Sequence, residues 1–159
     1  MKKIILFFGL IFLVSCGSPE EKKKGFEYNR TQKQQKKDYS VGETSVPIDL
    51  DNKGIGPIKN IDFGGSIDND LAQQGKAVFN QKCTACHMAN RKLIGPAMQG
   101  IYDRRSPEWV MNMLLNPTEM LKEDPIANAL LKEYNNVMML NQNLSQEETR
   151  SIAEYLRTL

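Results

Sequence analysis

The residues with the clearest chemical potential are Cys83-Thr84-Ala85-Cys86-His87. Two thiols three positions apart, followed directly by an imidazole, form the pattern to which a c-type haem is attached. In this chemistry both thiols add to vinyl groups of the porphyrin, and the imidazole binds the iron as the proximal ligand. We therefore expect Cys83 and Cys86 to hold one covalent haem c and His87 to ligate its iron.

Paired cysteines also occur in local disulfides, redox-active dithiols and zinc sites. A thioredoxin-like dithiol is expected near alternating strands and helices, and the sequence shows no such alternation. A zinc site needs four ligands, but His87 is the single histidine and no second Cys or His cluster follows. Copper handling is a further alternative, because Cys-x-x-Cys and eight methionines offer soft sulfur ligands to Cu(I).

The N-terminus has the features of an export signal. Two lysines precede an apolar run over residues 4–14, which is too short for a bilayer span of about 20 residues but suits a signal-peptide core. Leu13-Val14-Ser15-Cys16 follows and resembles the lipobox of bacterial lipoproteins, where the cysteine receives a diacylglycerol. We expect a lipoprotein signal peptide over 1–15 and a lipid anchor on Cys16. The alternative is an ordinary secretory signal with a chance cysteine.

The charge balance gives no reason to expect a nucleic-acid partner. The full chain has 21 Lys+Arg against 19 Asp+Glu, and removing Lys2 and Lys3 with the signal leaves 19 against 19. Nucleic-acid binding depends on an excess of basic side chains, so we expect none. An acyl anchor on Cys16 binds the bilayer without a basic patch.

We expect the protein to be a monomer.

The composition changes twice after the signal. Residues 16–40 are polar and charged, and they cannot bury enough apolar surface to offset their ordering entropy, so we interpret them as a disordered tether that starts at the lipidated cysteine. Residues 41–65 mix branched apolar residues with glycine and proline, which predicts an extended, turn-rich segment lying against the domain. The remaining residues, 66–159, form the predicted domain.

The domain is predicted to be all-α, with about four to five helices. A helical apolar spacing begins after the candidate caps Ser66 and Asp68, and Ser106-Pro107-Glu108 and Ser145-Gln146-Glu147-Glu148 are further helix starts. The pattern shows no alternating strand. The expected helical segments are 68–82, 106–116, a short turn at 118–123, 124–134, and a last helix from 145 to the end at 159.

Residues 66–159 resemble a small single-haem cytochrome c of class I, the type with His and Met ligands. In that family, a glycine and an aromatic on the N-terminal helix pack against an aromatic on the C-terminal helix, and Gly75, Phe79 and Tyr155 match these places. The resemblance implies a cytochrome c fold around one covalent haem. It also implies that the two terminal helices approach closely at the glycine.

The resemblance extends to the residue that orients the proximal imidazole and to the axial methionine. Ile94-Gly95-Pro96 resembles the family's Gly-Pro turn, which implies that the Pro96 carbonyl accepts the second N–H of the proximal imidazole. The family's axial methionine comes from the loop before the last helix, where Met138 and Met139 lie. The spacing to Leu144-Ser145 favours Met139, with Met138 as the alternative, although Leu140 stands where a proline is common.

The resemblance also implies that the middle of the domain passes near the haem propionates. Trp109, Arg104 and Arg105 offer an indole N–H and guanidinium groups that suit carboxylates. For the arginines the alternative is solvent-exposed charges at a turn. For Trp109 we expect packing in the haem pocket, whether or not its N–H reaches a propionate. The sequence of residues 105–112 also resembles that of lipoprotein cytochromes associated with nitrous oxide reductase systems.

These observations together predict an electron carrier and not an enzyme. An iron with His and Met ligands has no open position for a substrate and exchanges electrons with little rearrangement. We expect a lipid-anchored protein on the periplasmic side of the cell envelope, shuttling single electrons to or from a membrane-bound or periplasmic reductase or oxidase. The alternative is a haem sensor or enzyme with a labile sixth ligand that binds a gas or peroxide.

Overall fold

The structure, a computed structural model, describes residues 45–159. The predicted signal peptide, Cys16 and the predicted tether over 16–40 lie outside the described residues. The described helices are α1 (Asn69–Lys82), the 3-10 turn η1 (Ile101–Asp103), α2 (Pro107–Leu115), α3 (Pro117–Glu123), α4 (Pro125–Glu133) and α5 (Gln146–Leu156).

The predicted all-α fold is confirmed over residues 45–159. These residues form five α-helices, and their β-structure consists of one isolated bridge between Asp49 and Arg105. No helix in this part of the chain has the length and apolar character needed to cross a membrane.

Polar side chains mark the helix starts. Asp68, Ser106 and Asp124 each accept a hydrogen bond from the backbone N–H three residues further on, at 2.8–3.1 Å. Ser145 and Glu148 form the expected capping box at the start of α5. These bonds satisfy N–H groups that have no partner inside the helix, which is why each helix begins where it does.

The last helix is shorter than predicted. We expected it to continue to residue 159, but α5 ends at Leu156. The three following N–H groups bond to carbonyls three residues back, at 2.9–3.4 Å, in place of the four-residue spacing of an α-helix. The apolar stripe therefore predicted the buried face correctly but not the tightening of the final turn.

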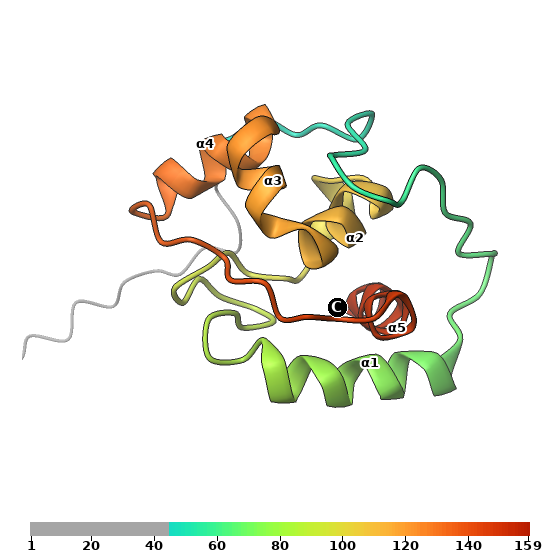
Figure 1. The fold of residues 1–159 in the computed structure, drawn as a ribbon. Coiled ribbons are helices and arrows are strands. Elements are labelled where there is room, and N and C mark those ends of the chain that lie inside the picture. The colour runs from blue at the N-terminus through green and yellow to red at the C-terminus, as the bar shows by residue number, and fades with distance from the viewer. Residues whose placement is uncertain (1–44) are drawn as a thin grey trace, which may run out of the picture. The chain divides into compact units, whose positions relative to one another are not determined.

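The helices form two groups. Figure 1 shows α1 and α5 side by side on one side of the domain and α2, α3 and α4 on the other. The loop after α1 lies at one end, and the loop between α4 and α5 runs between the two groups (Figure 1). Side chains from both groups and from these two loops line one cavity.

The contact between α1 and α5 matches the expectation from the sequence. A Cβ atom on Gly75 would lie 1.9 Å from the backbone oxygen of Ser151, so only glycine permits this approach. One turn further along, the rings of Phe79 and Tyr155 pack with centroids 5.4 Å apart. The terminal helices are therefore fixed against each other at two adjacent places.

A buried carboxylate holds the start of α1 to α5. Glu154 is fully buried and accepts a hydrogen bond from the backbone N–H of Asp68 at 3.0 Å. It also pairs with the guanidinium groups of Arg150 and Arg157 on its own helix end. These partners compensate the cost of burying its charge.

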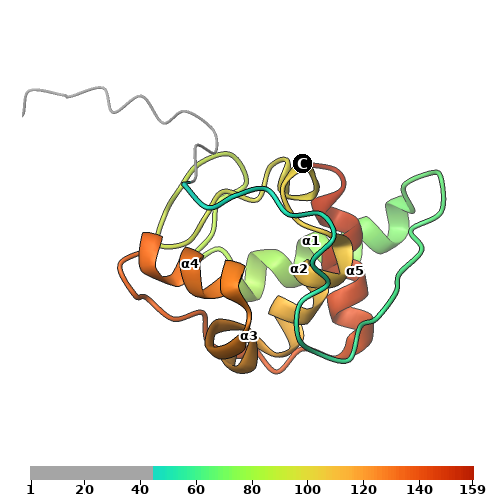
Figure 2. The same cartoon turned by 90° about the horizontal axis from the view of Figure 1, so that it is seen from above.

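Residues 45–58, which we call the strap, pack against the α2 side of the domain and cross over it in Figure 2. Val46 is buried in the core. The fully buried side chain of Asn112 donates to the carbonyls of Lys53 and Ile58, each at 2.8 Å, and accepts from the Ile58 N–H at 3.0 Å. One side chain of α2 thus replaces the backbone partners that a strand would supply.

The approach of α1 to α5 leads to a stability prediction. Gly75→Ala places a methyl group against the Ser151 backbone and forces the helices apart, so we expect a loss of about 1–3 kcal/mol or more in the free energy of unfolding. Urea unfolding of the haem-loaded protein measures it. The matched control is Gly65→Ala, where a Cβ meets nothing within 4 Å. Equal stability of the two variants would show that the helix contact is not as close as described.

Candidate haem site

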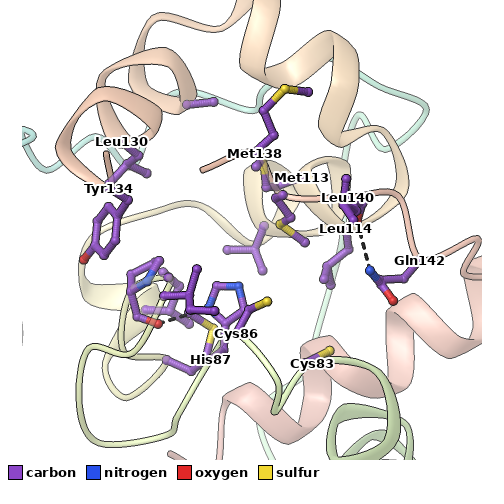
Figure 3. Close-up of a pocket in the computed structure, with 18 of the residues that line it drawn as sticks. Cys83, Cys86, His87, Met113, Leu114, Leu130, Tyr134, Met138, Leu140 and Gln142 are labelled. Carbon is purple, nitrogen blue, oxygen red and sulfur yellow. Dashed lines mark hydrogen bonds between the residues drawn. The ribbon is translucent and has the colours of Figure 1, made fainter. Parts of the chain in front are cut away.

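The Cys-x-x-Cys-His motif forms a tight turn at the end of α1. The backbone N–H of Cys83 still bonds to the Phe79 carbonyl at 2.9 Å and so ends the helix. The N–H groups of Cys86 and His87 then both bond to the Cys83 carbonyl, at 3.0 and 2.9 Å. Cys83 and Cys86 are free thiols, and Figure 3 shows both beside His87 at the edge of the cavity.

A second loop fixes the orientation of the imidazole. His87 Nδ1 lies 3.1 Å from the Pro96 carbonyl oxygen, the contact expected from the Gly-Pro turn. The Gly95 N–H bonds to the Cys86 carbonyl at 2.9 Å, and a Cβ on Gly95 would lie 2.4 Å from the His87 ring. Among residues 45–159, His87 Nε2 has no hydrogen-bond partner, so its lone pair is available to a metal ion.

Burial shifts the pKa values of Cys83 and His87 in the direction that favours their neutral forms. Burial raises the pKa of the Cys83 thiol to about 11, against a smaller opposing effect of Lys82. Burial lowers the pKa of His87, although its hydrogen bond to Pro96 opposes the shift. A neutral imidazole is the form that ligates iron.

A cavity of about 320 Å³ opens in front of these groups. Its wall is apolar and comes from both helix groups, with Val110, Met113 and Leu114 from α2, Leu130 and Leu131 from α4, and Ile152 and Leu156 from α5. Figure 3 shows Met113 and Leu114 across the space from His87, with Leu130 and Tyr134 at one side. Such a wall suits a large, flat, apolar group. Within the described part of the chain, no group of three or more His, Cys, Asp or Glu side chains is placed to hold a metal ion.

Both candidate axial methionines line this cavity. After α4, Asn135 and Asn136 adopt left-handed backbone angles, φ 59° and 58°, which asparagine tolerates better than most residues and which turn the chain back. Met139 is half-buried and packs against the hydrophobic core. Met138 is 55% exposed. The structure thus places both side chains at the cavity but buries Met139 further.

Trp109 lines the cavity, but its N–H points to a protein partner. The ring is 4% exposed, and Nε1 donates to Asp124 Oδ1 at 3.0 Å. The packing role expected for this tryptophan agrees with its position. Its indole N–H is used within the protein and is not directed at the cavity.

From the sequence we expected Arg104 and Arg105 near the haem propionates. In the structure neither residue belongs to the cavity lining. Arg104 donates to the carbonyls of Ala97 and Gln99, at 3.2 and 3.1 Å, and so braces the loop that follows Pro96. Arg105 is 2% exposed, donates to the Pro47 carbonyl of the strap, and lies 5.6 Å from the centroid of the Trp109 ring. The alternative of solvent-exposed charges therefore does not describe Arg105 either.

Two features of the site were missed in the sequence. Met98 and Met113 line the cavity, whereas only Met138 and Met139 were singled out among the methionines from the sequence. Asp124 was recognised as a helix start, but not as the partner of Trp109 and of Asn52 in the strap. The sequence around a capping aspartate looks the same whether or not its side chain also binds distant residues. The residues around Asp124 therefore gave no sign of its bonds to Trp109 and Asn52.

The residues present fit a covalent haem. Two adjacent thiols, an imidazole with a free Nε2, and a thioether on the lining are the donor set of a c-type haem with His and Met ligands. Gly95 leaves room for the imidazole, and the apolar wall suits a porphyrin.

Comparisons with known proteins agree with this site. A family model described as "Cytochrome c" matches residues 72–159, which are 88 of the 159 residues. The structure is similar to a cytochrome c from Rhodothermus marinus, with 45% identity, coverage of 65% of this chain and 88% of that chain, and a TM-score of 0.63.

A second similar structure is an engineered cytochrome c from Rhodothermus marinus bound to a carbene intermediate, with 44% identity, the same two coverages and a TM-score of 0.60. A comparison with curated protein sequences found no match. Because the family model covers more than half of the chain and a relative with 45% identity is covered over most of its length, the chain belongs to the cytochrome c family, whose members bind a covalent haem c and typically transfer electrons.

Proposed function

We propose that this protein is a membrane-tethered periplasmic electron carrier that passes single electrons through a His/Met haem c, to or from a membrane-associated or periplasmic reductase or oxidase. The observation that carries the proposal is the cavity itself, which has His87 with a free Nε2 at one wall and the half-buried Met139 on its lining.

Each residue of the site has one role in this proposal. Cys83 and Cys86 would hold the haem through two thioether bonds, and His87 Nε2 would ligate the iron. Pro96 accepts the Nδ1–H of His87, which holds the ring in place and makes Nε2 more basic. Met139, on the cavity lining, would supply the second protein ligand to the iron.

When bound, the haem iron supplies one-electron exchange between its ferric and ferrous states. With His87 and Met139 both holding the iron, no position would remain for a substrate and little would have to move on electron transfer. The apolar wall contributed by α2, α4 and α5 excludes water from the ring. Thioether ligation by Met139 favours the ferrous state and raises the reduction potential.

The proposed anchor brings the haem close to its partners. The strap already packs against the domain from Val46 onwards, so the linker from a lipid on Cys16 is about 30 residues long. Its root-mean-square reach is roughly 30 Å, from 5–6 Å times the square root of the length. Such a linker raises the effective concentration of the domain near membrane proteins. The resemblance of residues 105–112 makes nitrous oxide reductase systems the first partners to examine.

The ligand assignment predicts how two adjacent methionines differ. Met139→Ala removes the sixth ligand, so we expect a lower reduction potential and carbon monoxide binding to the ferrous protein. Met138→Ala is the matched control, because this residue is its neighbour on the same loop but is 55% exposed, and we expect neither change. Redox titration and absorption spectra measure both variants.

The wild type decides between a carrier and a gas-binding protein. We expect the weak long-wavelength sulfur-to-iron band in its ferric spectrum and no carbon monoxide binding to its ferrous form. Rapid binding of carbon monoxide to the folded wild type would contradict the electron-carrier proposal. If Met138→Ala opens the iron and Met139→Ala does not, the proposal stands and the ligand is Met138.

The anchor proposal is tested by fractionation. Cys16→Ser removes the thiol that would carry the lipid, so we expect the red haem protein to leave the membrane fraction and appear in the soluble periplasm. Ser18→Ala, two residues further on, is the control and should remain with the membranes. Membrane retention of Cys16→Ser would show that another element holds the protein there.

A further inference from the structure

A carboxylate lies directly behind the wall of the cavity. Asp124 is 2% exposed and accepts three hydrogen bonds, from Trp109 Nε1 at 3.0 Å, from the Ala127 N–H at 2.8 Å and from Asn52 Nδ2 at 2.7 Å. Two of its three donor residues, Trp109 and Ala127, line the cavity, whereas Asp124 does not. One residue layer therefore separates this carboxylate from the cavity.

The three donors suit a charged carboxylate. Hydrogen bonds donated to a buried carboxylate stabilise its ionised form and compensate for lost hydration. Asn52 cannot easily exchange its amide groups, because its Oδ1 accepts the Gly54 N–H at 2.8 Å while its Nδ2 donates to Asp124. The Ser106 hydroxyl donates to the Asn52 carbonyl at 2.6 Å and fixes this part of the strap. The surroundings of the carboxylate are thus rigid.

An opposite charge lies against the same tryptophan. The guanidinium of Arg105 is 5.6 Å from the centroid of the Trp109 ring, and the residue is as deeply buried as Asp124. Its hydrogen bonds go to carbonyl oxygens of Pro47 and Arg104. No ion pair within 4.0 Å joins Arg105 to a carboxylate in residues 45–159, so the two charges do not neutralise each other by direct contact.

We propose that Asp124 is a positioning residue with two effects on the bound haem: it holds the Trp109 ring in the cavity wall, and its buried negative charge lowers the reduction potential. This inference rests on the proposed function as a haem electron carrier. A ferric iron is more positive than a ferrous iron, so a nearby negative charge stabilises the oxidised state more. The effect persists because protein, and not water, fills the space between Asp124 and the cavity. Arg105 acts in the opposite direction.

The test is the reduction potential of three haem-loaded variants. Asp124→Asn removes the charge and keeps one oxygen for Trp109, so we expect a shift of the potential to a more positive value. Arg105→Gln removes the opposing charge, and we expect a shift to a more negative value. Glu123→Gln is the matched control, because it loses the same charge one residue away on an exposed side chain, and we expect little change.

A fourth variant separates the loss of the charge from the loss of a hydrogen bond. Asp124→Asn leaves two amide nitrogens facing each other at Asn52, so the double change Asn52→Asp with Asp124→Asn restores that hydrogen bond with the donor and acceptor exchanged. It keeps the net charge but moves the carboxylate into the strap, further from the cavity wall. We expect its potential to lie between those of the wild type and Asp124→Asn.

Two results would overturn the proposal. One is an unchanged or more negative potential in Asp124→Asn with the wild-type haem spectrum. The other is a double variant with the wild-type potential. The indole N–H signal of Trp109, the single tryptophan, reports the positioning effect by NMR and should lose its protection in Asp124→Ala. These readouts need bound haem but not Met139 ligation, so carbon monoxide binding by the wild type would defeat the proposed function and leave this inference testable.

Discussion

The close approach of α1 to α5 is the constraint on which the haem site depends. Gly75 lets the helix backbones meet, and the Phe79–Tyr155 pair fixes them one turn further along. Because Cys83 ends α1, this contact determines where the thiols and the imidazole stand relative to α5, whose Ile152 and Leu156 form part of the cavity wall. A shift of α1 would move the two thiols and the imidazole away from the cavity wall on α5. The packing of the two helices therefore determines the geometry of the haem site.

Local features of the sequence predicted most of this arrangement. Helix caps such as Ser106 and Ser145 act on backbone groups within three residues, and the attachment motif is one turn of chain, so each leaves a readable pattern. The helix contact and the Gly-Pro turn were available only through resemblance to a family, since neither spacing nor composition pairs Gly75 with α5 or Pro96 with His87. The predicted end of α5 at residue 159 was wrong because an apolar stripe records burial and not hydrogen-bond spacing.

The polar groups around Trp109 could not be predicted in this way. Arginine near a haem-binding segment suggests a propionate contact, yet Arg105 lies between Trp109 and the strap, where the Pro47 carbonyl accepts its hydrogen bond. Asp124 is 72 residues from Asn52 and 15 from Trp109, and only the fold brings the three together. A polar side chain can bind several kinds of partner, and the tertiary structure determines which of them is within reach. A single sequence therefore does not identify the partner.

The cavity wall also shows how the fold can separate ligation from electrostatics. Its lining is almost entirely apolar, because polar groups beside a porphyrin would be desolvated without partners. The buried charges of Asp124 and Arg105 are instead held one layer behind, where backbone groups, Trp109 and the strap supply hydrogen bonds. Under the proposed function, the iron ligands His87 and Met139 would come from the loops on either side of the cavity. The two buried charges lie elsewhere, at the start of α4 and just after η1. If Asp124 and Arg105 act as proposed, substitutions at these two residues would change the reduction potential without changing the ligands, so potential and coordination would vary independently.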